Sequence, residues 1–190
     1  MNTPSKLTAF ETEFPVAAIT QYATEAIHAC VAQAKKEFDP HFELDKAILT
    51  FAPEFKMSVG GIKYNYKKIK YEAFIRLALA LYLRLVKNNR TLFLNEYNHI
   101  CTDSKIGSVG NATLKKVIYT LVAHEIAHAV QFHVTLNSSN KTAITDMESA
   151  IATGEFKPHP GRGRNQAVIH GRLWQYIYRR FREEHVNGLE

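Results

Sequence analysis

The sequence predicts an α+β fold in which helices pack on a small sheet of about three strands. Apolar side chains recur at helical spacing in several segments, and short β-prone runs lie between those segments. The chain has 190 residues, of which 46% are hydrophobic, so it fits one domain with a buried core. We expect residues 14–187 to form that domain and residues 1–13 to form a flexible N-terminal segment.

The first part of the chain is predicted to contain one helix and two strands. Apolar residues recur at helical spacing from Pro15 to about Phe38, and a proline suits the first turn of a helix. Residues 47–51 form a short β-prone run. Residues 55–66 predict a second strand, in which Gly60-Gly61 forms a turn or bulge.

The remainder of the chain is predicted to be mainly helical. Helical spacing returns at residues 71–87, and residues 91–95 predict the third strand. A longer helix begins at Asn111 or Thr113, either of which can cap it, and ends near Phe132. A short helix, an irregular segment rich in proline and glycine, and a last helix follow at residues 142–152, 154–164 and 166–184. No repeat or linker divides the chain.

Two histidines of the long helix, His124 and His128, lie four residues apart and therefore point to the same side. Zn²⁺ favours nitrogen ligands in tetrahedral geometry, and this spacing lets both imidazoles reach one ion. Glu125 lies about 100° further round the helix, close enough to touch a metal-bound water without being a ligand. The three residues form the His-Glu-x-x-His arrangement of zinc peptidases, in which the carboxylate takes a proton from that water. Their neighbours are apolar, and a metal would offset the cost of burying three ionisable groups.

A third protein ligand has to come from another part of the chain, because two ligands do not close a zinc site. A histidine ten residues after the first is excluded, since that position is Val134. The remaining candidates are Glu148, His159 and His170. His170 opens an apolar stripe along the last helix, and a metal gives a reason for a histidine to face inward there. This observation favours His170 and leaves Glu148 and His159 as alternatives.

The motif of the long helix, followed by His170-Gly171-Arg172-Leu173-Trp174, resembles the SprT-like (Spartan-type) zinc metallopeptidases. In that family the third ligand lies in a His-Gly-x-x-aromatic motif that opens the last helix. The resemblance covers about residues 45–185 and implies a zincin-like metallopeptidase domain with the first motif on a central helix. It also implies that His124, His128 and His170 bind Zn²⁺ and that Glu125 is the general base of an endopeptidase. The separation of His128 from His170 is longer than is usual for the family, and the C-terminal cysteine zinc ribbon of many members is absent.

The formal net charge of +6 is consistent with contact to nucleic acid or another polyanion. Residues 63–71 mix lysines with aromatic residues, as single-strand binding surfaces do. Arginines near His170 form a second basic group. The residues expected to contact phosphates are Lys63, Lys67, Lys68, Lys70, Arg162, Arg164 and Arg172. A solvated positive surface that aids solubility is the alternative interpretation of the same charges.

The resemblance implies a protein or peptide substrate, and family members of the DNA-repair kind cleave proteins attached to DNA. We therefore expect a zinc-dependent endopeptidase that acts on DNA-associated or DNA-crosslinked proteins. Two alternatives remain open: a peptidase that selects acidic proteins without DNA, and a non-enzymatic, zinc-stabilised module that binds nucleic acid or protein. The motif glutamate argues against the module, since structural zinc does not require a carboxylate there.

The sequence also predicts a cytoplasmic protein without a membrane partner. It contains no apolar run long enough to cross a bilayer, and its first residues lack the profile of a signal peptide. Its two cysteines, Cys30 and Cys101, exclude a disulfide framework.

Overall fold

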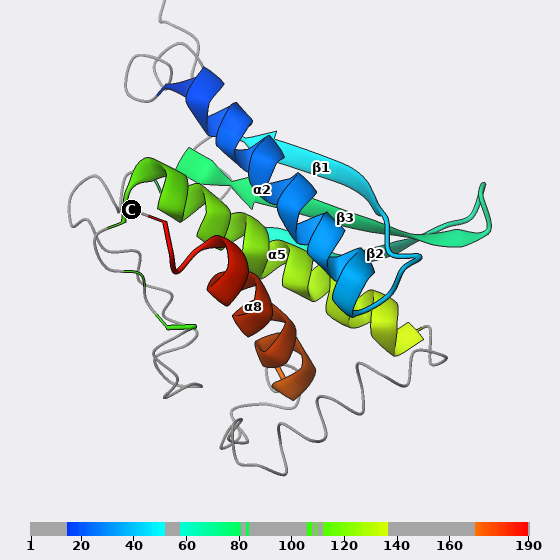
Figure 1. Cartoon of the computed structure of the whole chain (residues 1–190). Coiled ribbons are helices and arrows are strands. Elements are labelled where there is room, and N and C mark those ends of the chain that lie inside the picture. The colour runs from blue at the N-terminus through cyan, green and yellow to red at the C-terminus, as the bar shows by residue number, and fades with distance from the viewer. Residues whose placement is uncertain are drawn as a thin grey trace, which may run out of the picture.

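The computed structural model describes residues 15–51, 58–80, 83, 106–107, 109, 112–136 and 170–189, apart from the side chain of Arg172. In these residues the elements are α2 (Val16–Glu37), β1 (Leu44–Thr50), β2 (Val59–Asn65), β3 (Lys70–Ala78), α5 (Leu114–Leu136) and α8 (Arg172–His185). Three helices and a three-stranded mixed sheet make this the α+β class that the sequence predicts (Figure 1).

The described strands lie in the order β1-β3-β2, so β3 is the central strand. Strand β1 runs parallel to β3, and β2 runs antiparallel to it. Strands β2 and β3 form a hairpin whose turn is residues 66–69. The turn projects away from the helices (Figure 1).

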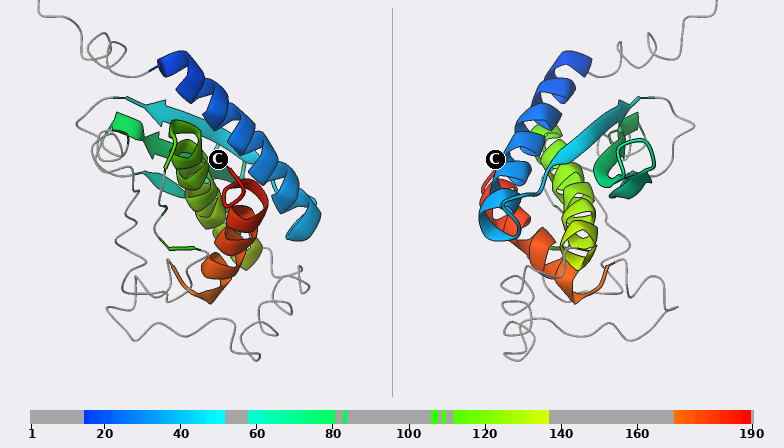
Figure 2. Two further views of the ribbon diagram at one scale, coloured as in Figure 1. Left: turned by 60° about the vertical axis from the view of Figure 1, so that its left-hand side comes forward. Right: turned by 90° about the vertical axis from the view of Figure 1, so that its right-hand side faces the viewer.

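Helix α5 forms the middle of the fold, between the sheet and the other two helices (Figure 2). It packs on β2 and β3 with one side and on α2 and α8 with the other. Every residue from Val117 to Gln131 is buried as a result. The fold therefore places the whole His-Glu-x-x-His motif in the interior.

The three helices confirm most of the helical predictions. Helix α2 begins directly after Pro15, as expected. Helix α5 is capped by Thr113, whose Oγ1 accepts a hydrogen bond from the backbone N–H of Lys116 at 3.2 Å, and it ends at Leu136, one turn later than predicted. Helix α8 begins at Arg172; the earlier residues of the predicted last helix lie outside the described part of the chain.

Two predictions for the sheet are wrong. The helix expected over residues 71–87 begins instead as strand β3, whose side chains from Ala73 onward are wholly or partly buried on both faces. A strand that is buried on both faces carries a nearly continuous run of apolar residues. In such a run, apolar residues also occur at helical spacing, so the sequence does not distinguish a helix from a strand. The expected turn or bulge at Gly60-Gly61 is also absent: both glycines lie in β2, in continuous register with Ile75 and Phe74 of β3.

Several predicted features lie outside the described residues. They are the N-terminal segment 1–13, the strand at 91–95, the start of the expected second strand, the short helix at 142–152 and the irregular segment 154–164. The third strand of the observed sheet is β3. In the described part of the chain, no helix combines the length and apolar character needed to span a membrane.

Candidate metal centre

Three histidines meet where α8 begins beside the middle of α5. His124 and His128 are one helical turn apart on α5, and His170 stands two residues before α8. All three are largely shielded from solvent, and one ring nitrogen from each lies within 4.8 Å of the others. Because the apolar side of α8 packs into the core, its first turn is held against α5. The buried residues on that side are Trp174, Ile177, Tyr178 and Phe181.

The spacing of the ring nitrogens fits a metal ion better than a hydrogen-bonded cluster. His128 Nε2 lies 3.2 Å from His124 Nε2 and 3.1 Å from His170 Nε2. A neutral imidazole nitrogen carries either one hydrogen or one lone pair, so it cannot satisfy both contacts as hydrogen bonds. Two nitrogen ligands of a tetrahedral Zn²⁺, each at its usual bond length, are about 3.3 Å apart. The three histidines could therefore hold a metal ion.

The interior keeps the three imidazoles neutral. Burial lowers the pKa of His124 well below its usual value, and the neighbouring histidines lower it further. Burial and His170 lower the pKa of His128 to about 3, and burial lowers that of His170 to about 4. Metals bind the neutral form of histidine, so the site is ready for a cation at neutral pH.

Glu125 is placed beside the histidines and not among them. Its side chain is 6% exposed, and its Oε1 lies 3.9 Å from His124 Nε2. At that distance a carboxylate can accept a proton from a small molecule bound at the histidine cluster. The arrangement places one carboxyl group next to a neutral site for a cation.

Trp174 is a component of the site that sequence reasoning did not assign. Its indole has close ring contacts with His124, His128 and His170, and its Nε1 donates a hydrogen bond to the backbone oxygen of His124 at 3.4 Å. In the sequence, Trp174 is the aromatic residue of the His-Gly-x-x-aromatic motif, four residues after His170, but the motif alone assigns no role to its indole.

The other candidate ligands are not part of the observed cluster. Glu148 and His159 lie outside the described residues, so neither alternative is tested. His133, also on α5, does not join the cluster: its Nε2 lies 3.0 Å from Asp39 Oδ2, and its ring packs on Phe42.

The predicted phosphate-contacting residues are divided between the hairpin and undescribed parts of the chain. Lys63 lies on β2, Lys67 and Lys68 in the turn, and Lys70 at the start of β3. Arg162 and Arg164 lie outside the described residues, as does the side chain of Arg172. The structure thus brings four of the seven residues together on one hairpin.

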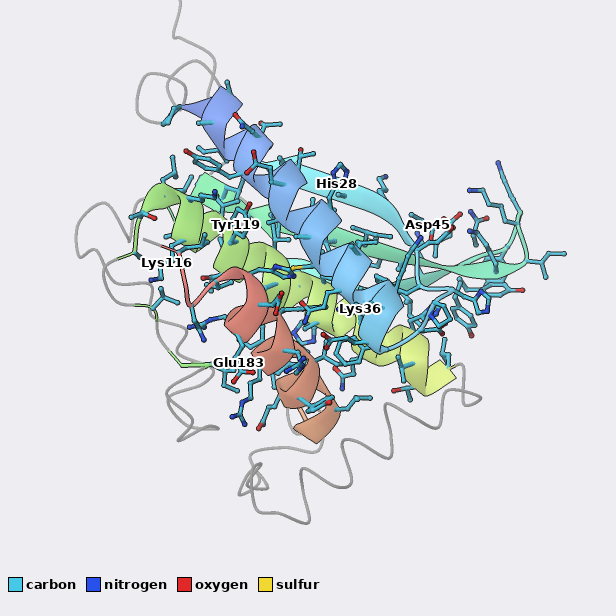
Figure 3. The ribbon with its side chains drawn as sticks, in the orientation of Figure 1. His28, Lys36, Asp45, Lys116, Tyr119 and Glu183 are labelled. Atoms are coloured by element: carbon cyan, nitrogen blue, oxygen red, sulfur yellow. The ribbon has the colours of Figure 1, made fainter. Side chains whose placement is uncertain are left out.

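The lysines of the hairpin are not equivalent. Lys68 forms an ion pair with Glu72 at 2.8 Å, and Lys70 forms one with Asp45 of β1, also at 2.8 Å. Asp45 is labelled in Figure 3. Lys63 and Lys67 have no carboxylate partner among the described residues. Two of the four ammonium groups are therefore already partly neutralised.

Aromatic and aliphatic side chains surround these lysines. Tyr66 is 84% exposed, Ile69 78% and Tyr71 54%, and the ring of Tyr64 contacts the rings of both other tyrosines. Ile69 also has a positive φ of 53°, a conformation that β-branched residues rarely adopt. The hairpin turn thus exposes apolar groups next to positive charge.

Comparisons of this chain with models of protein families, with curated proteins and with solved structures found no match.

Proposed function

We propose that this chain is a zinc-dependent endopeptidase of the SprT-like kind, with Glu125 as its general base. The observation that carries the proposal is the convergence of three neutral, buried imidazoles, two on α5 and one two residues before α8, with a carboxylate oxygen 3.9 Å from one of them. A purely structural zinc site gains nothing from a buried carboxylate that is not a ligand. Hydrolysis requires such a base.

In the proposed reaction His124, His128 and His170 would hold the ion. Bound Zn²⁺ would polarise the scissile carbonyl and lower the pKa of a water molecule. Glu125 takes a proton from the attacking water as its oxygen bonds to the carbonyl carbon. The same carboxyl group then gives that proton to the leaving amine nitrogen as the C–N bond breaks.

Strand β2 offers a place for the substrate backbone. It is an edge strand of the described sheet, and it packs against α5 at Glu125. An extended peptide can add to such an edge through main-chain hydrogen bonds, which recognise a chain without requiring one sequence. This supports an endopeptidase that accepts unfolded protein segments.

The test compares the wild type with Glu125→Gln and His128→Ala. We expect one zinc per chain in the wild type and in Glu125→Gln, and much less in His128→Ala. Cleavage of unfolded and DNA-crosslinked proteins should fall by about 10²-fold or more in Glu125→Gln, since general-base catalysis contributes that much. Equal behaviour of the wild type and Glu125→Gln in both assays would instead support a zinc-stabilised binding module.

The hairpin favours single-stranded DNA as a partner of the same protein. Exposed tyrosine rings offer stacking surfaces for bases, and Lys63 and Lys67 offer cations for phosphates. Binding should weaken steeply as salt rises, and nuclease treatment should reduce cleavage of DNA-bound substrates. Activity that survives nuclease digestion would favour a peptidase that selects acidic proteins.

A further inference from the structure

We infer that Trp174 is a positioning residue, which holds the three histidines in their metal-binding arrangement; the inference rests on the metal centre of the proposed function. Trp174 is fully buried in the first turn of α8. It is also the only tryptophan in the chain. Its role follows from how its ring meets the three imidazoles.

One indole contacts all three rings, each in a different way. It stacks on His128, with centroids 5.2 Å apart and planes 27° apart. It meets His170 edge-on at 4.7 Å and 82°, and His124 at 5.1 Å and 61°. These contacts restrict the rotation of each imidazole about its side-chain bonds, because interiors are close-packed.

The indole is also fixed to the backbone of the motif helix. Its Nε1 donates to the carbonyl oxygen of His124 at 3.4 Å. This bond joins α8 to α5 at the residue that supplies a ligand. The indole therefore sets both the orientation of the rings and the position of His170 relative to α5.

A column of side chains along α8 supports the indole from behind. Tyr178 stacks on Trp174 at 4.8 Å and 24°, and Arg182 Nη1 donates to the Tyr178 hydroxyl at 3.1 Å. Arg182 is buried and also donates to the backbone oxygen of Gly107. Trp174, Tyr178 and Arg182 follow one another at intervals of four residues, so they share one side of α8.

A preorganised ligand set binds its ion more tightly, because less side-chain freedom is lost on binding. Removing the indole should therefore weaken metal binding even in molecules that remain folded. A residue that only supports the core would lower stability without changing metal affinity. This difference separates positioning from packing.

The experiment measures the dissociation constants of Zn²⁺ and Co²⁺ by competition with a chromophoric chelator, together with the thermal stability of each metal-free variant. Trp174→Leu should bind both ions at least tenfold more weakly than the wild type. Trp174→Phe keeps an aromatic ring and should recover most of that loss. The matched control is Phe181→Leu, a fully buried residue of α8 that packs on Phe38 and not on the histidines.

Phe181→Leu should lose stability but keep the wild-type metal affinity. The inference is overturned if Trp174→Leu binds metal within twofold of the wild type, or if Phe181→Leu weakens binding equally. If Trp174→Leu does not fold, Trp174→Phe takes its place in the comparison with Phe181→Leu. Trp174→Phe should then bind metal about threefold more weakly than the wild type, and binding within twofold of the wild type overturns the inference.

Tryptophan emission gives an independent measurement in the unaltered protein. Addition of Zn²⁺ should change the emission of Trp174, and the titration curve should give the same dissociation constant as chelator competition. Addition of Co²⁺ should quench the emission. Metal binding without any change in emission would contradict the inference. If the wild type binds no metal, the metal centre of the proposed function is refuted, and not only the role of Trp174. None of these measurements depends on peptidase activity.

Discussion

Gly60 of β2 lies directly against the backbone of Glu125, so closely that a Cβ atom on Gly60 would overlap the carbonyl oxygen of Glu125. The neighbouring Gly61 has no such restriction: a Cβ there would meet only the rings of Phe132 and Phe74, at 3.8 Å or more. The absence of one side chain thus allows the sheet to approach the helix residue that carries the proposed base.

Gly60→Ala should displace β2 from α5 and disturb Glu125. Overpacking of this kind costs about 1–3 kcal/mol. The overlapping atom is the backbone oxygen of Glu125, which cannot move away by a side-chain rotation. Urea unfolding should show this loss, and peptidase activity should fall with it. Gly61→Ala is the matched control and should stay within about 0.5 kcal/mol of the wild type. Similar losses in both variants would mean that the close approach is unimportant.

Removal of metal should destabilise the wild type. An ion that binds only the folded chain contributes about 4 kcal/mol when its free concentration is a thousand times the dissociation constant. A chelator should therefore lower the melting temperature of the wild type and of Glu125→Gln, but not that of His128→Ala. A melting temperature that does not respond to chelator in the wild type would contradict a metal centre.

The contact between α2 and α8 should weaken in acid. Burial alone would raise the pKa of Glu37, but hydrogen bonds from Arg180 at 3.0 and 3.2 Å and one from Gln33 outweigh it, so the pKa lies below its usual value of 4.5. A lowered pKa stabilises the fold above the unfolded-state value, and this contribution is lost as pH falls through the folded-state value. Both side chains are partly exposed, so the effect is under about 1 kcal/mol.

The measurement is urea unfolding at pH 7 and near pH 3 for the wild type and Glu37→Gln. Glu37→Gln should be less stable than the wild type at pH 7, and the difference should shrink at the lower pH. Glu184→Gln is the control, because Glu184 of the same helix is exposed and forms no ion pair with another described residue. If the wild type and Glu37→Gln differ in free energy of unfolding by the same amount at both pH values, the lowered pKa of Glu37 is contradicted.

The lysines of the hairpin should contribute unequally to binding of single-stranded DNA. Lys63→Gln with Lys67→Gln should reduce the slope of log affinity against log salt by about 1.4, at about 0.7 per phosphate contact. Lys68→Gln with Lys70→Gln should have a smaller effect, because Glu72 and Asp45 already pair with those lysines. Titrations at several salt concentrations distinguish the two pairs, and equal slopes would argue against phosphate contact by Lys63 and Lys67.

Ile69→Asn should stabilise the protein. A left-handed conformation costs an ordinary residue about 1–2 kcal/mol, whereas asparagine adopts it more readily. Because Ile69 is exposed, the substitution removes little packing, and a gain of about 1 kcal/mol is expected in urea unfolding. Tyr66→Asn, at an equally exposed position without positive φ, should give no gain.

The helices and the motif could be predicted because their signals are local. Helical spacing, Pro15 and Thr113 mark α2 and α5, and the stripe that begins at His170 predicts the side of α8 that packs inward. Strand β3 could not be recognised, because burial on both faces removes the alternation that marks a strand.

The contacts that hold the site are not local. That Trp174 touches three histidines depends on how α8 crosses α5, and the need for glycine at position 60 depends on how closely the sheet approaches α5. Apart from His170 and Trp174, the residues joined by these contacts are far apart in the sequence, so no spacing in the sequence reports the contacts. The same applies to the ion pair of Lys70 with Asp45, which are 25 residues apart, whereas the ion pair of Lys68 joins residues only four apart.

The distance along the chain between the histidines has a topological consequence. His128 and His170 are 42 residues apart, so an ion shared between them closes a loop of that length. In the chain-entropy description of cross-links, a loop of this size restricts the unfolded chain by about 4 kcal/mol. The ion would act as a removable cross-link: its loss would return that freedom to the unfolded chain, while α8 keeps its apolar contacts with α5 in the folded protein.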